Sequence, residues 1–142
     1  MTPEGLRGTD MPDDCPVNSM PGEIKLLLVD DDREKRFLIA LSLNREFVGL
    51  RLTECESGAA AIEHLQRESV DAIITDNSMS PINGLELLDW VRARDPQLPV
   101  IMVTGNSEIE PLALQAGASA VLPSLNFNEI GTVLRRFLSR TD

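Results

Sequence analysis

The fold of this chain is decided by the stretch LLLVDDD, residues 26 to 32. The apolar run reaches back to Ile24 and ends abruptly in three aspartates. A run with no polar alternation is typical of a strand that is buried on both faces, as in the centre of a parallel sheet. We therefore interpret Ile24–Val29 as a central strand and the aspartates as the loop that leaves it.

The rest of the chain alternates between short strand patterns and amphipathic helix patterns. The predicted strands that follow are Leu50–Cys55, Ala72–Thr75, Val100–Val103 and a short one around Ala120–Leu122. The predicted helices run from about Arg33 to Phe47, from an N-cap at Ser57 to about Arg67, from about Gly84 to Arg94, from about Ile109 to Ala116, and along the stripe Ile130, Val133, Leu134, Phe137 and Leu138. In the first helix we expect Phe37, Leu38 and Leu41 to form the core face.

Five strand–helix units in a row predict an α/β fold, a parallel sheet with helices on both faces. The run Leu50–Cys55 alternates apolar and polar residues, which suits a strand at a sheet edge. The strand order that fits is 2-1-3-4-5, the flavodoxin-like doubly wound arrangement. In such sheets the ligand lies beyond the carboxyl ends of the strands, where the order reverses between strands 1 and 3.

Composition and charge limit the classes of function. The chain has 142 residues and a formal net charge of -10, which argues against direct binding of nucleic acid. We find no apolar run long enough to cross a membrane. Cys15 and Cys55 have no metal-ligand spacing, which favours reduced thiols and a cytoplasmic location. We interpret residues 1–22, which are rich in Pro, Gly and Asp, as a flexible acidic arm, and residues 23–142 as one domain.

Polar side chains stand at the carboxyl ends of three predicted strands. Asp30, Asp31 and Asp32 follow the first strand, Asp76 the third and Thr104 the fourth. Carboxylates that converge on one pocket repel each other unless a cation intervenes, and Mg²⁺ suits oxygen ligands of this kind. With such a metal bound, Asp76 could attack a phosphoryl donor as a nucleophile. The alternative for a single aspartate is a helix cap, which is a sufficient explanation for Asp32.

The sequence resembles the response-regulator receiver family of two-component signalling over roughly residues 24–138. The matching pieces are LLLVDDD (26–32), IITDNSMSPINGLELL (73–88), PVIMVTG (99–105) and LQAGAS (114–119). The resemblance implies that Asp30 and Asp31 hold Mg²⁺ or Mn²⁺, with Asp76 as phosphoacceptor and Ser78 lending its backbone carbonyl. It also implies that Thr104 binds the phosphoryl group, and that Ser78 and Asn106 influence dephosphorylation.

The same resemblance implies a signalling role rather than a metabolic enzyme. We expect a receiver without an output domain that takes a phosphoryl group from a histidine kinase or a phosphotransfer protein. Beyond Mg²⁺-dependent self-phosphorylation and autodephosphorylation, no catalytic activity is implied. Its output would be contacts with a downstream protein, or a homodimer, through the face of the fourth helix, fifth strand and fifth helix, with no contact to nucleic acid or membrane.

One family feature is missing from this sequence. Receivers normally carry a lysine just after the fifth strand, where this chain reads Val121-Leu122-Pro123-Ser124-Leu125. The two lysines of the chain, Lys25 and Lys35, lie near the first strand. Arg33 could substitute for the missing cation. The alternative hypothesis is a degenerate receiver that acts as a docking or dimerisation module independently of phosphorylation.

Overall fold

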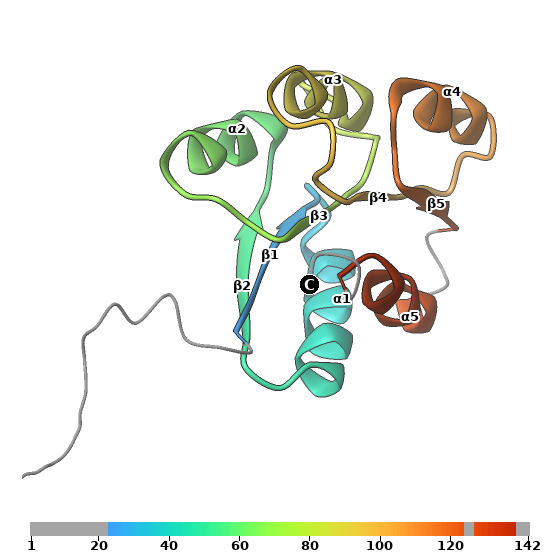
Figure 1. The fold of residues 1–142 in the computed structure, drawn as a ribbon. Coiled ribbons are helices and arrows are strands. Elements are labelled where there is room, and N and C mark those ends of the chain that lie inside the picture. Colours follow the sequence, from blue (N-terminus) through green and yellow to red (C-terminus); the bar gives the residue numbers. More distant parts are fainter. Residues whose placement is uncertain (1–22, 124–126, 139–142) are drawn as a thin grey trace, which may run out of the picture.

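The computed structural model describes residues 23–123 and 127–138, which form a parallel sheet of five strands with helices on both sides (Figure 1). The strands are β1 (Ile24–Val29), β2 (Leu50–Cys55), β3 (Ala72–Thr75), β4 (Val100–Val103) and β5 (Ala120–Leu122). Their order is β2-β1-β3-β4-β5. The predicted flavodoxin-like topology is therefore confirmed. The proposed arm, residues 1–22, lies outside the described ranges.

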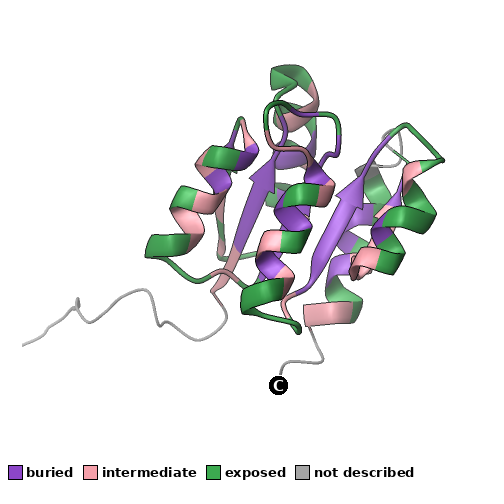
Figure 2. Cartoon of the chain, turned by 90° about the horizontal axis from the view of Figure 1, so that it is seen from above, coloured by how far each residue is buried: buried purple, intermediate pink, exposed green. Residues whose placement is uncertain are grey.

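Two layers of helices cover the sheet. The helices are α1 (Arg33–Glu46), α2 (Gly58–Arg67), α3 (Gly84–Arg94), α4 (Ile109–Ala116) and α5 (Phe127–Leu138). Helices α1 and α5 lie together on one face, and α2, α3 and α4 lie side by side on the other (Figure 1). Their outward sides are exposed and their sheet-facing sides are buried (Figure 2). Within the described ranges, none of these helices has the length and apolar character needed to cross a bilayer.

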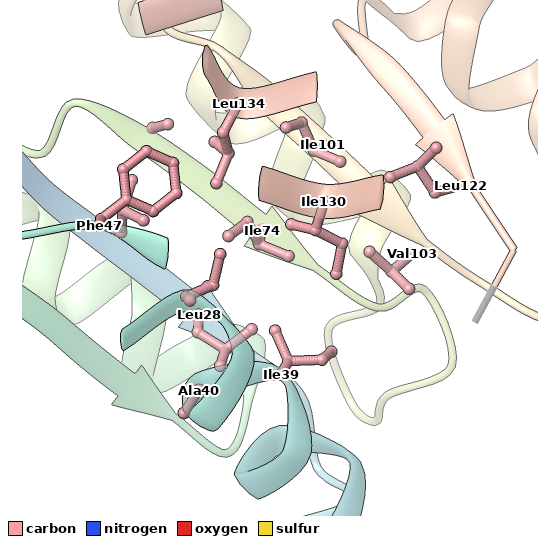
Figure 3. Close-up of a cluster of buried hydrophobic side chains, with 13 residues drawn as sticks. Leu28, Ile39, Ala40, Phe47, Ile74, Ile101, Val103, Leu122, Ile130 and Leu134 are labelled. Carbon is pink, nitrogen blue, oxygen red and sulfur yellow. The ribbon is translucent and has the colours of Figure 1, made fainter. Parts of the chain in front are cut away.

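The core is divided by the sheet because successive side chains of a strand point to opposite faces. Leu26 and Leu28 of β1 pack with residues of α1 and α5 such as Ile130 (Figure 3). Leu27 and Val29 of the same strand pack in the second cluster, with α2 and α3. All four side chains are at most 1% exposed, so residues 26–29 of β1 are buried on both faces, as their apolar run predicts.

The predicted core face of α1 is wrong. Phe37, Leu38 and Leu41 are 61%, 46% and 41% exposed. The helix instead packs on the sheet through Ile39, Ala40 and Leu43. Apolar residues occupy several sides of this helix, so their spacing alone does not say which side faces the sheet.

Candidate phosphoryl and metal site

The carboxyl ends of β1 and β3 are locked together by the backbone. Strand β1 lies between β2 and β3 with Val29 opposite both Cys55 and Thr75. The N–H of Asp30 donates to the carbonyl of Cys55 at 3.0 Å, and the N–H of Asp76 donates to the carbonyl of Val29 at 3.0 Å. These bonds continue the ladder by one residue on each strand. Asp30 and Asp76 therefore leave the sheet side by side, at the point where the strand order reverses.

Three aspartates meet at this point. One carboxylate oxygen each from Asp30, Asp31 and Asp76 lies within 4.8 Å of the other two. Asp30 and Asp76 are buried, whereas Asp31 is exposed. The cluster thus combines two buried carboxylates with one that is exposed to solvent, and we call it the acidic pocket. Three of the four residues that the sequence singled out for metal binding, Asp30, Asp31 and Asp76, are thus brought together.

The carboxylate of Asp30 is buried, and its pKa is raised. Its Oδ1 accepts the N–H of Asp32 at 2.8 Å, and its buried Oδ2 is paired with the ammonium group of Lys35 at 3.1 Å. Burial raises the pKa of Asp30, against the opposing effects of the Asp32 N–H and the charge of Lys35. Three carboxylates that each offer an oxygen within 4.8 Å of the other two are a donor set that suits a hard divalent cation. The residues present therefore fit Mg²⁺.

Lys35 is the residue of this site that sequence reasoning missed. Its Nζ lies 3.1 Å from Asp30 Oδ2 and 3.3 Å from Asp76 Oδ1, and its side chain is 17% exposed. It belongs to the first turn of α1, where the N-cap Asp32 accepts the N–H groups of Glu34 and Lys35. Arg33, the substitute considered from the sequence, is exposed instead. The available signal was the position of Lys35 in the first turn of the helix that follows the switch-point strand.

The loop from β3 to α3 is held by Asn77, a second residue that the sequence did not single out. Its buried side chain accepts the N–H of Leu85 at 3.0 Å, and its carbonyl accepts the N–H of Gly84 at 3.1 Å. Gly84 permits this contact because a Cβ there would collide with the backbone of Asp76 and Asn77. Ser78, the next residue, is exposed at the rim of the pocket.

Thr104 stands at the same edge of the sheet, directly after β4. It is 5% exposed, and its N–H donates to the carbonyl of Leu122 at 3.0 Å. Its Oγ1 accepts the N–H of Asn106 at 3.2 Å. The side chain of Asn106 accepts the N–H of Glu108 at 3.0 Å, so in this structure it supports the turn that leads into α4.

The strand that should precede the family's lysine carries no charge. Val121 is half-buried, Leu122 is buried and Pro123 is exposed. Ser124 and Leu125, which the sequence also offered for the position of the family's lysine, lie outside the described residues. Among the described residues, the cation that contacts both buried carboxylates comes from α1.

Comparison with known proteins agrees with this geometry. Residues 26–126 match the family model of the response regulator receiver domain. The chain is 33% identical over 115 residues to the DNA-binding transcriptional regulator NtrC of Escherichia coli K12, a match that covers 79% of this chain and 24% of NtrC. It therefore spans about a quarter of the length of that relative.

Solved structures agree as well. The receiver domain of sensor histidine kinase PA1611 from Pseudomonas aeruginosa, which has a magnesium ion in its active-site cleft, superposes with a TM-score of 0.74 at 25% identity, covering 82% of this chain and 98% of that one. TrrA from Thermotoga maritima, in complex with Mg²⁺ and beryllofluoride, superposes with a TM-score of 0.73 at 27% identity, covering 80% and 98%.

The chain belongs to the response regulator receiver domain family and is a module of phosphorylation-based two-component signalling. Receiver domains bind Mg²⁺ in an acidic pocket and accept phosphoryl groups from histidine kinases. The family is a class of signalling domains rather than of metabolic enzymes.

Proposed function

We propose that Asp76 accepts a phosphoryl group from a histidine kinase or a phosphotransfer protein in a reaction that requires Mg²⁺ or Mn²⁺. The observation that carries this proposal is the meeting of Asp30, Asp31 and Asp76 within 4.8 Å at the switch point of the sheet. Asp76 is the one that leaves β3, and its backbone is fixed to β1 by the bond to Val29. Its carboxylate is therefore held in one place while a donor approaches from solvent.

Each residue of the pocket has a distinct task in the proposed reaction. Asp30, Asp31, Asp76 and the carbonyl of Ser78 would hold the divalent cation, which when bound neutralises the phosphoryl oxygens. A carboxylate oxygen of Asp76 forms the new bond to phosphorus, and the bond from phosphorus to the donor's imidazole nitrogen breaks. The imidazole leaves with that electron pair. Thr104 then donates its hydroxyl hydrogen to a phosphoryl oxygen.

Ser78 and Asn106 are proposed to set the lifetime of the phosphorylated state. Both are exposed and flank the pocket, Ser78 after β3 and Asn106 after β4. In the proposed role, these two side chains control the access of water to the phosphoryl group. Autodephosphorylation would proceed by attack of a water molecule on phosphorus, which breaks the bond from phosphorus to the Asp76 oxygen, releases inorganic phosphate and leaves Asp76 as a free carboxylate.

The output is proposed to be a protein contact on the face formed by α4, β5 and α5. Leu112 and Leu114 of α4 are 52% and 47% exposed. Thr104 connects the pocket to this face because it lies between β4 and α4 and bonds to the end of β5. The partner would be a downstream protein or a second copy of the chain.

We also propose a cytoplasmic location and no direct contact with nucleic acid or membrane. Cys55 is a free, buried thiol, which fits a reducing compartment. The formal net charge of -10 opposes binding to phosphate backbones.

The test is phosphorylation by a small phosphodonor with Mg²⁺, followed by intact-protein mass spectrometry. We expect the wild type to gain the mass of one phosphoryl group and Asp76→Asn to gain none. Asp89→Asn, which alters an exposed aspartate of α3, is the matched control and should behave as the wild type. A wild type that stays unmodified and also fails to bind beryllofluoride with Mg²⁺ would instead favour a docking module independent of phosphorylation.

A further inference from the structure

A phosphoryl group on Asp76 needs a cation that this sequence does not provide after β5. An aspartyl phosphate adds a dianionic group to a pocket that already holds two other carboxylates, and a charge-assisted hydrogen bond is the strong way to stabilise it. Val121, Leu122 and Pro123 carry no charge. The chain has two lysines in total, and one of them is Lys35.

The position of Lys35 is set by the start of α1. Its backbone N–H is capped by Asp32, and its ammonium group lies between Asp30 Oδ2 and Asp76 Oδ1, at 3.1 and 3.3 Å. The neighbouring Arg36 fixes the base of the same turn, because its Nη1 donates to the carbonyl of Asp30 at 2.7 Å and its Nε pairs with Glu54 at 3.1 Å. Lys35 is thus anchored at its backbone and has a flexible stem toward the pocket.

We propose that Lys35 is the phosphoryl-binding cation of this receiver, supplied from α1 in place of a lysine after β5. This rests on the proposed phosphorylation of Asp76. The ammonium group of Lys35 lies between the two buried carboxylates that would hold a divalent ion. Binding of the ion therefore displaces it from Asp30, and phosphorylation of Asp76 gives it new oxygen acceptors within reach of its present position.

The charges support the assignment. With Asp30 and Asp31 ionised, a phosphoryl dianion on Asp76 brings the pocket to four negative charges. One divalent ion and the ammonium group of Lys35 together offset three of these negative charges. A divalent ion and a lysine after β5 would offset the same number. Without Lys35 only two would be offset. Lys35 thus affects the two ligands in opposite directions. It lowers the affinity for Mg²⁺ alone, because it competes for the same carboxylates, and it raises the affinity for a phosphoryl group once Mg²⁺ is bound.

This change of sign gives the test. Lys35→Met, Lys35→Arg and the control Lys25→Met are compared with the wild type by two titrations, Mg²⁺ alone and beryllofluoride at saturating Mg²⁺. Lys25 lies near the start of β1, away from its carboxyl end. For Lys35→Met we expect Mg²⁺ to bind about two- to fivefold more tightly, the effect of one ion pair lost. We expect beryllofluoride to bind roughly ten- to hundredfold more weakly, the effect of one charge-assisted hydrogen bond lost. Lys35→Arg should retain most of the beryllofluoride affinity, and Lys25→Met should change neither value.

The outcomes separate this inference from the proposed function. If Lys35→Met tightens both ligands, the ammonium group only fills the metal position, and the inference is overturned. If it changes neither affinity, the inference is also overturned, while binding that is lost in Asp76→Asn would leave the proposed function standing. A wild type that binds Mg²⁺ but no beryllofluoride overturns both. Equal urea midpoints for Lys35→Met and Lys35→Arg show that both variants are folded.

Discussion

Replacing Gly84 with alanine should damage the site through the backbone. The added Cβ would collide with the carbonyl oxygen of Asp76 and lie 2.8 Å from the Cα of Asn77. Neither atom can move aside easily, because both belong to backbone that is held by hydrogen bonds. The N–H of Asp76 donates to the carbonyl of Val29, and the carbonyl of Asn77 accepts the N–H of Gly84. Overpacking of this kind costs about 1–3 kcal/mol, and the gain in helix propensity offsets at most about 1 kcal/mol. We expect a net loss of about 1–2 kcal/mol in the free energy of unfolding.

Gly131→Ala is the matched control for this experiment. The atoms nearest to a Cβ at Gly131, in α5, belong to the carboxylate end of the Glu46 side chain, which can rotate away. The price is a weakening of the Glu46–Arg135 ion pair, 3.5 Å apart and partly exposed, worth about 0.2–1 kcal/mol. A similar gain in helix propensity offsets it.

Urea unfolding followed by circular dichroism measures both variants, and a Mg²⁺ titration follows on the folded proteins. Gly84→Ala should also bind Mg²⁺ more weakly, since the backbone that moves includes Asp76 and leads to the carbonyl of Ser78. If Gly84→Ala is as stable as Gly131→Ala and binds Mg²⁺ as the wild type does, the close approach of α3 to Asp76 does not constrain the site.

Three further predictions follow from the packing, the caps and the charges. Phe37→Ser should change the free energy of unfolding by at most about 0.5 kcal/mol because the side chain is 61% exposed, whereas Leu43→Ala, at a fully buried position, should cost about 2–5 kcal/mol; equal losses in urea titrations would contradict the assigned core face of α1. Asn83→Ala removes the side-chain oxygen that accepts the Glu86 N–H at the start of α3, one of the two bonds of the capping box, and should cost about 1 kcal/mol. Asn83→Asp should largely avoid this loss in the same assay. Burial raises the pKa of Asp30 above 3.8. The native state therefore holds this proton more tightly than the unfolded chain does. The stability contributed by Asp30 is lost as the pH rises from 3.8 through the raised pKa. The difference in unfolding free energy between wild type and Asp30→Asn, measured in chelator, should therefore fall over that range, and a rise would refute the assignment.

The sheet and the acidic cluster could be predicted because both follow from local patterns. Mostly apolar runs identify β1, β3 and β4, and the order of a doubly wound sheet brings their carboxyl ends to one edge. Asp30 and Asp76 then meet as a consequence of the topology. The prediction required no knowledge of side-chain packing.

The orientation of α1 and the role of Lys35 could not be obtained in the same way. Both depend on how far α1 is rotated about its own axis, which is set by packing against β1 and α5 and by the Asp32 cap. The apolar residues of α1 lie on more than one side, so the sequence allowed Phe37 to face inward. The same rotation that exposes Phe37 directs Lys35 into the pocket.

Alternate residues of β1 belong to the two hydrophobic clusters on opposite faces of the sheet. A shift of the strand by one residue therefore affects both clusters together. Removing one residue inside β1 would exchange the surroundings of Leu27 and Leu28, and would put Asp31 where Asp30 now stands. An odd insertion would do the same in the other direction. Changes in chain length are therefore tolerable in the turns at the amino ends of the strands, opposite the acidic cluster. A single residue added to or lost from an inner strand would instead disrupt both hydrophobic clusters and the acidic cluster at once.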